Sequence, residues 1–190
     1  MNHIRKEPEE ESITIIEPER VSSVSDDNKP VTNRIVPPHN KKSRLVKKSD
    51  VNRVVEEAKV LHELCLTPHG LYQGAFAVHH SQIDATDPMD FFVTAEKRII
   101  INPLITRHSN YTKDSNEACI TFEMESLKTA QRWQKIEVEY LTIMLDPEDK
   151  EKFKLSSLIQ ESLSGFDSFV FQHEVDHGQA KYLYQFLIKK

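Results

Sequence analysis

Six residues near the C-terminus, Gln172-His173-Glu174-Val175-Asp176-His177, decide how the rest of the chain is interpreted. They contain the pattern H-E-x-x-H. If the segment is helical, His173 and His177 share one face, so both imidazoles can reach one metal ion. Glu174 lies about 100° further round the helix, where it can reach a metal-bound water but cannot complete a tetrahedron of ligands. The pattern predicts a metal site, although a chain with nine histidines can match so short a motif by chance.

The segment after the motif narrows the kind of metal site. In zinc proteases the third ligand lies downstream of H-E-x-x-H. Here residues 178–190 hold no His, Cys, Asp or Glu side chain. The third ligand must therefore come from upstream, or no closed metal site exists, and an ordinary zinc peptidase is disfavoured.

Length and composition favour one globular domain. Of the 190 residues, we expect 1–12 to be a disordered charged tail and 13–190 to form the domain. With 25 basic against 30 acidic side chains, the net charge of −5 argues against a nucleic-acid partner. No apolar run approaches the roughly 20 residues of a membrane span, and the N-terminus lacks the apolar core of a signal peptide. Only two cysteines, Cys65 and Cys119, are present, which fits a reducing cytoplasm.

Apolar periodicity predicts an α+β fold. Apolar residues recur at helical spacing from Val51 to Cys65, between a Ser49 cap and Thr67-Pro68, and Cys65 is expected to be a small buried hydrophobe. Strands are gathered in the middle of the chain, with one helix before them and one after, which favours α+β over alternating α/β. The predicted strands are 13–16, 75–83, 91–93, 98–101 and 136–143, with a polar loop from 111 and a short surface helix within 146–160.

Three separated stretches resemble the peptide deformylase family. Residues 172–177, with Gly165 seven residues before Gln172, match the family's G-L-x-A-x-x-x-Q-H-E-x-D-H almost position for position. Residues 117–121, Glu-Ala-Cys-Ile-Thr, resemble E-G-C-L-S. Residues 75–82 align without a gap to G-x-G-L-A-A-x-Q, but both glycines are alanine and the Ala-Ala pair is His-His. The resemblance implies antiparallel sheets packed around a C-terminal metal-binding helix, with an N-terminal helix.

The resemblance also supplies the missing upstream ligand. It implies that Cys119 joins His173 and His177, which leaves a fourth position for water. One divalent metal ion is expected, Fe(II) in the cell by resemblance to the family. Zn or Ni would also suit these donors, and ligand types alone cannot choose among them.

The family's mechanism assigns roles to further residues. Glu174 would take a proton from the metal-activated water and deliver it to the departing amine. The Gln82 side-chain amide and the Ile120 backbone N–H would hold the oxyanion beside the metal. A backbone donor is unchanged by the Leu-to-Ile difference from the family motif.

Other residues are expected around this centre. Asp176 is expected behind the ligands, paired with Arg132, although Arg132 can equally be read as a surface charge. Glu117 is expected to make structural hydrogen bonds near the Cys119 loop. Ala77 and Ala118 would border the cleft in which the family binds a peptide as an added strand, where a β-carbon can obstruct close approach.

The His-His pair has no counterpart in the family motif. We expect one of His79 and His80 to be a satisfied interior histidine and the other to face solvent. A fourth ligand from His80 would close the metal site, and it is not expected.

The resemblance implies a hydrolase that removes the formyl group from N-terminal formyl-methionine and releases formate. Its partners would be formyl-methionyl peptides of nascent chains, near the ribosome exit, and it would be a cytoplasmic monomer in a bacterium, a phage-infected bacterium or an organelle. Two alternatives stay open. One is a deformylase-like protein that binds a peptide or a partner without turnover, and the other is a zinc peptidase.

Overall fold

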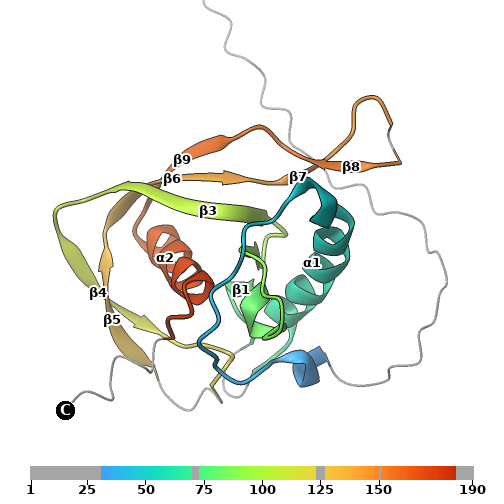
Figure 1. Ribbon diagram of the computed structural model, residues 1–190. Coiled ribbons are helices and arrows are strands. Elements are labelled where there is room, and N and C mark those ends of the chain that lie inside the picture. Colours follow the sequence, from blue (N-terminus) through green and yellow to red (C-terminus); the bar gives the residue numbers. More distant parts are fainter. Residues whose placement is uncertain (1–30, 70–72, 123–126, 150, 183–190) are drawn as a thin grey trace, which may run out of the picture.

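The computed structural model describes residues 31–69, 73–122, 127–149 and 151–182. The predicted tail 1–12 and the predicted strand 13–16 lie outside the described residues. Figure 1 shows helix α2 below the main sheet, between β1 and the β4–β5 ribbon, with α1 on the other side of β1. No helix of the described part is both long enough and apolar enough to cross a membrane.

The main sheet has five antiparallel strands in the order β1-β2-β3-β6-β9. A second sheet pairs β4 with β5, and a small hairpin pairs β7 with β8. Together with two α-helices this is the predicted α+β class. The strands are β1 (Ala77–His79), β2 (Phe91–Thr94), β3 (Ile99–His108), β4 (Thr112–Glu117), β5 (Lys128–Trp133), β6 (Lys135–Leu141), β7 (Ile143–Leu145), β8 (Phe153–Leu155) and β9 (Ile159–Ser164).

Helix α1 (Val51–Leu66) forms where the apolar spacing predicts it. It begins after Asp50, one residue later than the predicted Ser49 cap, and ends where the Thr67 N–H bonds back to the Leu64 carbonyl. Its buried stripe includes Cys65, which confirms the expectation for that thiol. This stripe packs on the sheet, so burial of one apolar face stabilises both elements. Three 3₁₀ helices complete the list: η1 (Val31–Arg34), η2 (Lys48–Asp50) and η3 (His80–Gln82).

Helix α2 (Phe166–Gly178) has an unusual inward face. Gly165 precedes its first residue, and its φ of +60° is a conformation that favours glycine. Phe171 packs edge-to-face against Phe92 of the sheet, with ring centroids 5.4 Å apart. Most other buried residues of the helix are polar, namely Ser168, Gln172, Glu174 and His177. Buried polar groups cost free energy unless they are satisfied, so this face indicates a functional site.

Several predicted elements are wrong, and the errors share a cause. The surface helix within 146–160 is absent, because residues 153–155 and 159–164 form β8 and β9. The polar residues from 112 form strand β4, and the polar strand β5 was not predicted. The expected strand 75–83 is extended only over Ala77–His79 and then turns into η3. The strand predicted at 98–101 continues to His108, and the one at 136–143 divides into β6 and β7. Each of these segments depends on a partner strand that is distant in sequence, which local periodicity does not reveal.

Candidate metal centre

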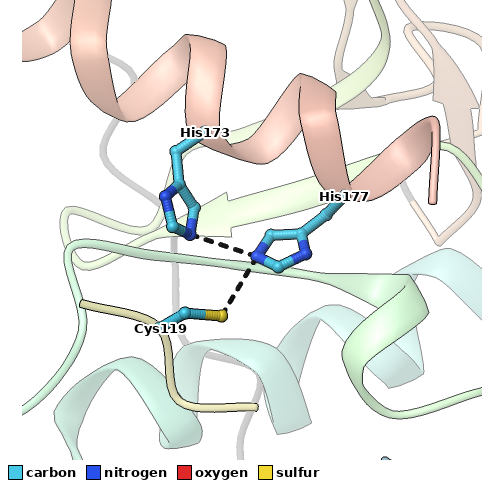
Figure 2. Close-up of side chains that lie close together, drawn as sticks. All are labelled: Cys119, His173 and His177. Atoms are coloured by element: carbon cyan, nitrogen blue, oxygen red, sulfur yellow. Dashed lines mark hydrogen bonds between the residues drawn. The ribbon is translucent and has the colours of Figure 1, made fainter. Parts of the chain in front are cut away.

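Three donor side chains converge at the inner face of α2. Figure 2 shows His173 and His177 projecting from one face of the helix toward Cys119, which lies on the loop after β4. The two Nε2 atoms are 3.1 Å apart, and His177 Nε2 is 3.3 Å from Cys119 Sγ. One donor atom from each residue lies within 4.8 Å of the other two.

These distances fit a metal ion at the centre of the cluster. Tetrahedral Zn with bonds of about 2.0–2.1 Å to nitrogen and about 2.3 Å to sulfur would separate two nitrogens by about 3.3 Å and a nitrogen from sulfur by about 3.6 Å. The observed 3.1 Å and 3.3 Å are only slightly shorter. One thiol and two imidazoles also form a donor set that transition metals prefer. The residues therefore fit a metal.

The two histidines are aimed by hydrogen bonds outside the cluster. His173 Nδ1 lies 2.9 Å from Glu117 Oε2, so the Nδ1 proton points to that carboxylate and Nε2 is the nitrogen that faces the cluster. Gln172 fixes the helix itself, since its amide exchanges two 2.9 Å hydrogen bonds with the backbone N–H and C=O of Trp133. The turn of α2 that carries the imidazoles is thus anchored to β5.

A buried charge cluster supports this arrangement. Arg132 donates two 2.8 Å hydrogen bonds to Glu117 and one of 2.6 Å to Asp176. Burial raises the pKa of Glu117, but hydrogen bonds from Arg132 and His173 outweigh it and lower the pKa to about 2. Arg132 is 8% exposed, so it is a buried partner of Glu117 and Asp176 and the surface-charge interpretation is wrong.

Without a metal, the two imidazoles are held in different charge states. Burial lowers the pKa of His173, but hydrogen bonds to Cys119 and Glu117 outweigh it and raise the pKa to about 10. Burial, followed by the charge of His173, holds the pKa of His177 well below its ordinary range. Metal ligation at His173 must therefore displace a proton.

Glu174 is a buried carboxyl with spare hydrogen-bonding capacity. It is 3% exposed, and among the described residues its Oε2 has no hydrogen-bond partner. Burial raises its pKa to about 7. A carboxyl poised near neutral pH beside a cluster of donors suits a general base.

Gln82 reaches the same centre from η3. Its Nε2 donates to Thr121 Oγ1 at 2.9 Å and lies 3.6 Å from Cys119 Sγ. Ile120 is 8% exposed, and no hydrogen bond among the described residues uses its backbone N–H. Thr121 was not expected at the site, although its place in the Glu-Ala-Cys-Ile-Thr motif was a signal.

A cavity of about 150 Å³ opens beside these groups. Ala77 and Ala118 line it, and so do Gln82, Cys119, His173 and Glu174. Phe76 and Phe166, which also line the cavity, are largely exposed and pack edge-to-face at 4.6 Å. An apolar rim next to converging polar groups is typical of a ligand pocket.

Comparisons with known proteins identify the family of this chain. The profile of the family described as polypeptide deformylase matches residues 40–190. The chain belongs to the polypeptide deformylase family. A comparison with curated protein sequences gives no match.

Solved deformylases share the fold. Peptide deformylase from Thermotoga maritima is 21% identical with a TM-score of 0.61, over 77% of this chain and 88% of that one. The enzyme of Vibrio parahaemolyticus bacteriophage VP16T, solved with actinonin, is 21% identical with a TM-score of 0.56, over 82% and 96% of the two chains. Peptide deformylase 1B of Arabidopsis thaliana, solved with an inhibitor, is 16% identical with a TM-score of 0.61, over 80% and 79%.

Within the deformylase fold, the His-His pair departs from expectation. His79 and His80 are both completely buried, so the prediction that one faces solvent is wrong. His80 Nε2 lies 2.5 Å from Glu57 Oε2, and His80 is not part of the donor cluster of Cys119, His173 and His177. Glu57 on α1 is the hydrogen-bond partner of this imidazole. The two residues lie on different elements, so the spacing of residues in the sequence does not reveal the pair.

Proposed function

We propose that this protein is a metal-dependent peptide deformylase, which removes the formyl group from N-terminal formyl-methionine and releases formate. The observation that carries the proposal is the position of Glu174. It is a buried carboxyl whose Oε2 has no hydrogen-bond partner in the described part of the chain, on the helix that also presents His173 and His177 toward Cys119. A protein that only bound a peptide would have no need of a base there.

Cys119, His173 and His177 would hold the metal ion. When bound, the ion supplies Lewis acidity, which lowers the pKa of a water and polarises the formyl carbonyl. Fe(II) is the metal we propose in the cell, on the resemblance to the family, with Zn or Ni as alternatives that the same donors can hold.

The protein side chains would move the proton and bind the developing charge. Glu174 accepts the proton of the attacking water and returns it to the amine as the amide bond breaks. Gln82 Nε2–H and the Ile120 backbone N–H donate hydrogen bonds to the oxyanion. Loss of one such donor typically costs about 3 kcal/mol of transition-state stabilisation. Glu117, Arg132 and Asp176 keep the imidazoles oriented during the reaction.

We propose nascent polypeptides as the substrates, handled by a monomer in the cytoplasm of a bacterium, a phage-infected bacterium or an organelle. The cavity beside Glu174 would take the methionine side chain, with the peptide alongside β1. Ala77 and Ala118 line this cavity at positions where the family motif has glycine. These two residues favour a second candidate, a protein that binds a peptide and does not turn it over.

Formate release from formyl-Met-Ala-Ser separates these functions. The protein would be purified without oxygen and loaded with Fe(II), and Glu174→Ala would serve as control. Formate that appears with the wild type and not with the control supports a deformylase. Peptide-bond cleavage without formate would indicate a peptidase. Tight peptide binding without either product, with the metal confirmed bound, would favour the binding protein.

A further inference from the structure

Two adjacent histidines, His79 at the end of β1 and His80 at the start of η3, are not used by the proposed mechanism. His80 Nδ1 lies 2.8 Å from the Met89 backbone N–H, which can only donate, so Nδ1 is the acceptor. The proton of the neutral ring is then on Nε2, which donates to Glu57 Oε2. His80 thereby ties η3 to α1 and to Met89, two residues before β2, and its ring stacks on Phe91 with the centroids 4.9 Å apart.

His79, one residue earlier, is held in the same way, with Nδ1 accepting a backbone N–H and Nε2 beside a carboxylate. Its Nδ1 accepts the Ser81 backbone N–H at 3.1 Å, and its Nε2 lies 3.3 Å from Asp90 Oδ1. The space for this pair exists because residue 178 is glycine. A β-carbon on Gly178 would lie 2.5 Å from Asp90 Oδ1 and 3.3 Å from His79 Nε2.

The backbone of this turn orients the side chain of Gln82. Gln82 Oε1 accepts the His79 backbone N–H at 2.8 Å. With its oxygen held there, the amide must direct its NH₂ group to the other side, toward Thr121 Oγ1 and Cys119 Sγ. The direction of the Gln82 donor therefore depends on where η3 holds residue 79.

Glu57 is itself held in place. Arg53, one turn earlier on α1, donates to Glu57 Oε1 at 3.1 Å and to Asp84 and Asp87 at 2.6 Å and 2.8 Å. These two aspartates lie just after η3 in the sequence. Arg53 and Glu57 of α1 therefore bond to η3 through His80 and to the segment after η3 through Asp84 and Asp87. The turn is held by several contacts and not by one.

We propose that Glu57, acting through His80, and Asp90, acting through His79, are positioning residues that hold the Gln82 amide toward the metal centre. This inference rests on the proposed deformylase function, in which Gln82 is an oxyanion donor. A shift of about 1 Å in such a group can reduce turnover by about 10²-fold, so the anchors have kinetic consequences although they touch no substrate.

The first test is a double-mutant cycle on the Fe(II)-loaded enzyme. Glu57→Ala and His80→Ala should each lower kcat by about 10-fold to 10²-fold, with metal content and KM unchanged. Gln82→Ala alone should lower kcat by about 10²-fold to 10³-fold. In the Gln82→Ala background, either second change should cost less than about 3-fold, because the group that it positions is gone.

His62→Ala is the matched control. His62 is another histidine of the chain whose ring bonds to a distant segment, the Ala95 backbone carbonyl at 3.2 Å, and among the described residues no hydrogen bond joins it to η3. It should leave kcat unchanged. If His80→Ala fails to fold, Glu57→Ala still carries the test, since it leaves the imidazole and its bond to Met89 in place. Unchanged kcat in Glu57→Ala, or a full loss repeated in the Gln82→Ala background, would overturn the proposal.

A second readout does not need activity. In the zinc-loaded protein, the side-chain NH₂ signals of Gln82 can be assigned by NMR from their loss in Gln82→Ala. Glu57→Ala should raise the hydrogen-exchange rate of these protons by about 10-fold or more, whereas His62→Ala should not. An unchanged exchange rate in Glu57→Ala would contradict the positioning role. If the wild type releases no formate and exchange still rises, the deformylase proposal fails while the positioning of Gln82 stands.

Discussion

His173 Nδ1 and Glu117 Oε2 lie 2.9 Å apart, and the same carboxylate oxygen also accepts a 2.8 Å hydrogen bond from Arg132. Glu117 therefore links a proposed metal ligand to a buried cation. The bond fixes which nitrogen of His173 faces the cluster, and it makes that nitrogen a more basic metal ligand. The metal affinity of the site should depend on a residue that does not contact the metal.

Glu117→Ala should weaken zinc affinity by about 10-fold to 100-fold, because His173 loses the acceptor that orients it and Arg132 loses its main partner. A competition titration with a chromophoric chelator measures the change. Glu56→Ala, which removes an exposed glutamate on α1, should leave the affinity as it was. Equal zinc affinity in Glu117→Ala and the wild type would refute the orienting role.

Cys119→Ala should lose both tight metal binding and activity, because two imidazoles on one helix form an incomplete site. Metal content after dialysis measures this directly. The chain provides a matched control in its other cysteine, since Cys65 is buried in the core and its Sγ lies 3.4 Å from the Val93 carbonyl. Cys65→Ala should retain one metal per chain. Stoichiometric metal in three-ligand geometry in Cys119→Ala would show that the site is assigned wrongly.

Glu174→Ala should keep the metal and lower kcat by about 10²-fold to 10⁴-fold, the usual contribution of a positioned general base. Formate release and metal content measured on one sample separate the two effects. Asp167→Asn, an exposed carboxylate in the first turn of the same helix, should change neither. Retained turnover in Glu174→Ala would mean that another group takes the proton.

Gly178→Ala should destabilise the protein by about 1–3 kcal/mol. The added β-carbon would lie 2.5 Å from Asp90 Oδ1. The sign of this change in the free energy of unfolding is informative, because a Gly-to-Ala substitution inside a helix usually stabilises by roughly 0.5–1 kcal/mol. Urea unfolding measures the difference. Ala180→Gly, at a residue with φ of +56°, should be neutral or stabilising. A more stable Gly178→Ala would show that the space is not needed.

Acid should weaken the anchor around Arg53. Burial raises the pKa of Asp84, but hydrogen bonds from its neighbours, including Arg53, outweigh it and leave that pKa well below the ordinary range. Hydrogen bonds from Arg44 and Arg53 lower the pKa of Asp87 to about 2. Because both folded values lie below the unfolded value of about 3.9, this stabilisation is complete above about pH 5 and is lost as the pH falls through the folded values.

The urea concentration at the unfolding midpoint should therefore decrease as the pH is lowered from 6 to 3. In Arg53→Met the stability should be lower at pH 6, and the fall should be smaller, because Asp84 and Asp87 no longer gain that partner. An equal pH dependence in the variant and the wild type would show that Arg53 does not account for the low pKa values.

The elements that sequence reasoning located are those with a strong local signal. Helix α1 has an apolar stripe that repeats every three or four residues from Val51, and the structure places it there. Strand β5, Lys128–Trp133, has no such signal, since its side chains alternate around a two-stranded ribbon that carries few apolar residues. Strand β9 was obscured by the charged segment before it, and its pairing with β6 decides its conformation.

The candidate site divides in the same way. The four-residue spacing of His173 and His177 was sufficient to predict that they share a helix face. The same reasoning required an upstream ligand but could not choose it, and the family resemblance pointed to Cys119. Burial of both His79 and His80 was not predictable, because their partners are distant in sequence: Asp90 lies just before β2 and Glu57 lies on α1.

The sequence by itself determined the helix that carries the motif and the pair of imidazoles on one face of it, because helical geometry relates residues that are close along the chain. Only the tertiary structure decided which loop brings a thiol within 3.3 Å of His177 and which buried partners hold the Gln82 amide toward it. Those contacts depend on where sheet and helices place distant segments, and the burial that results also raises the pKa of Glu174 to about 7.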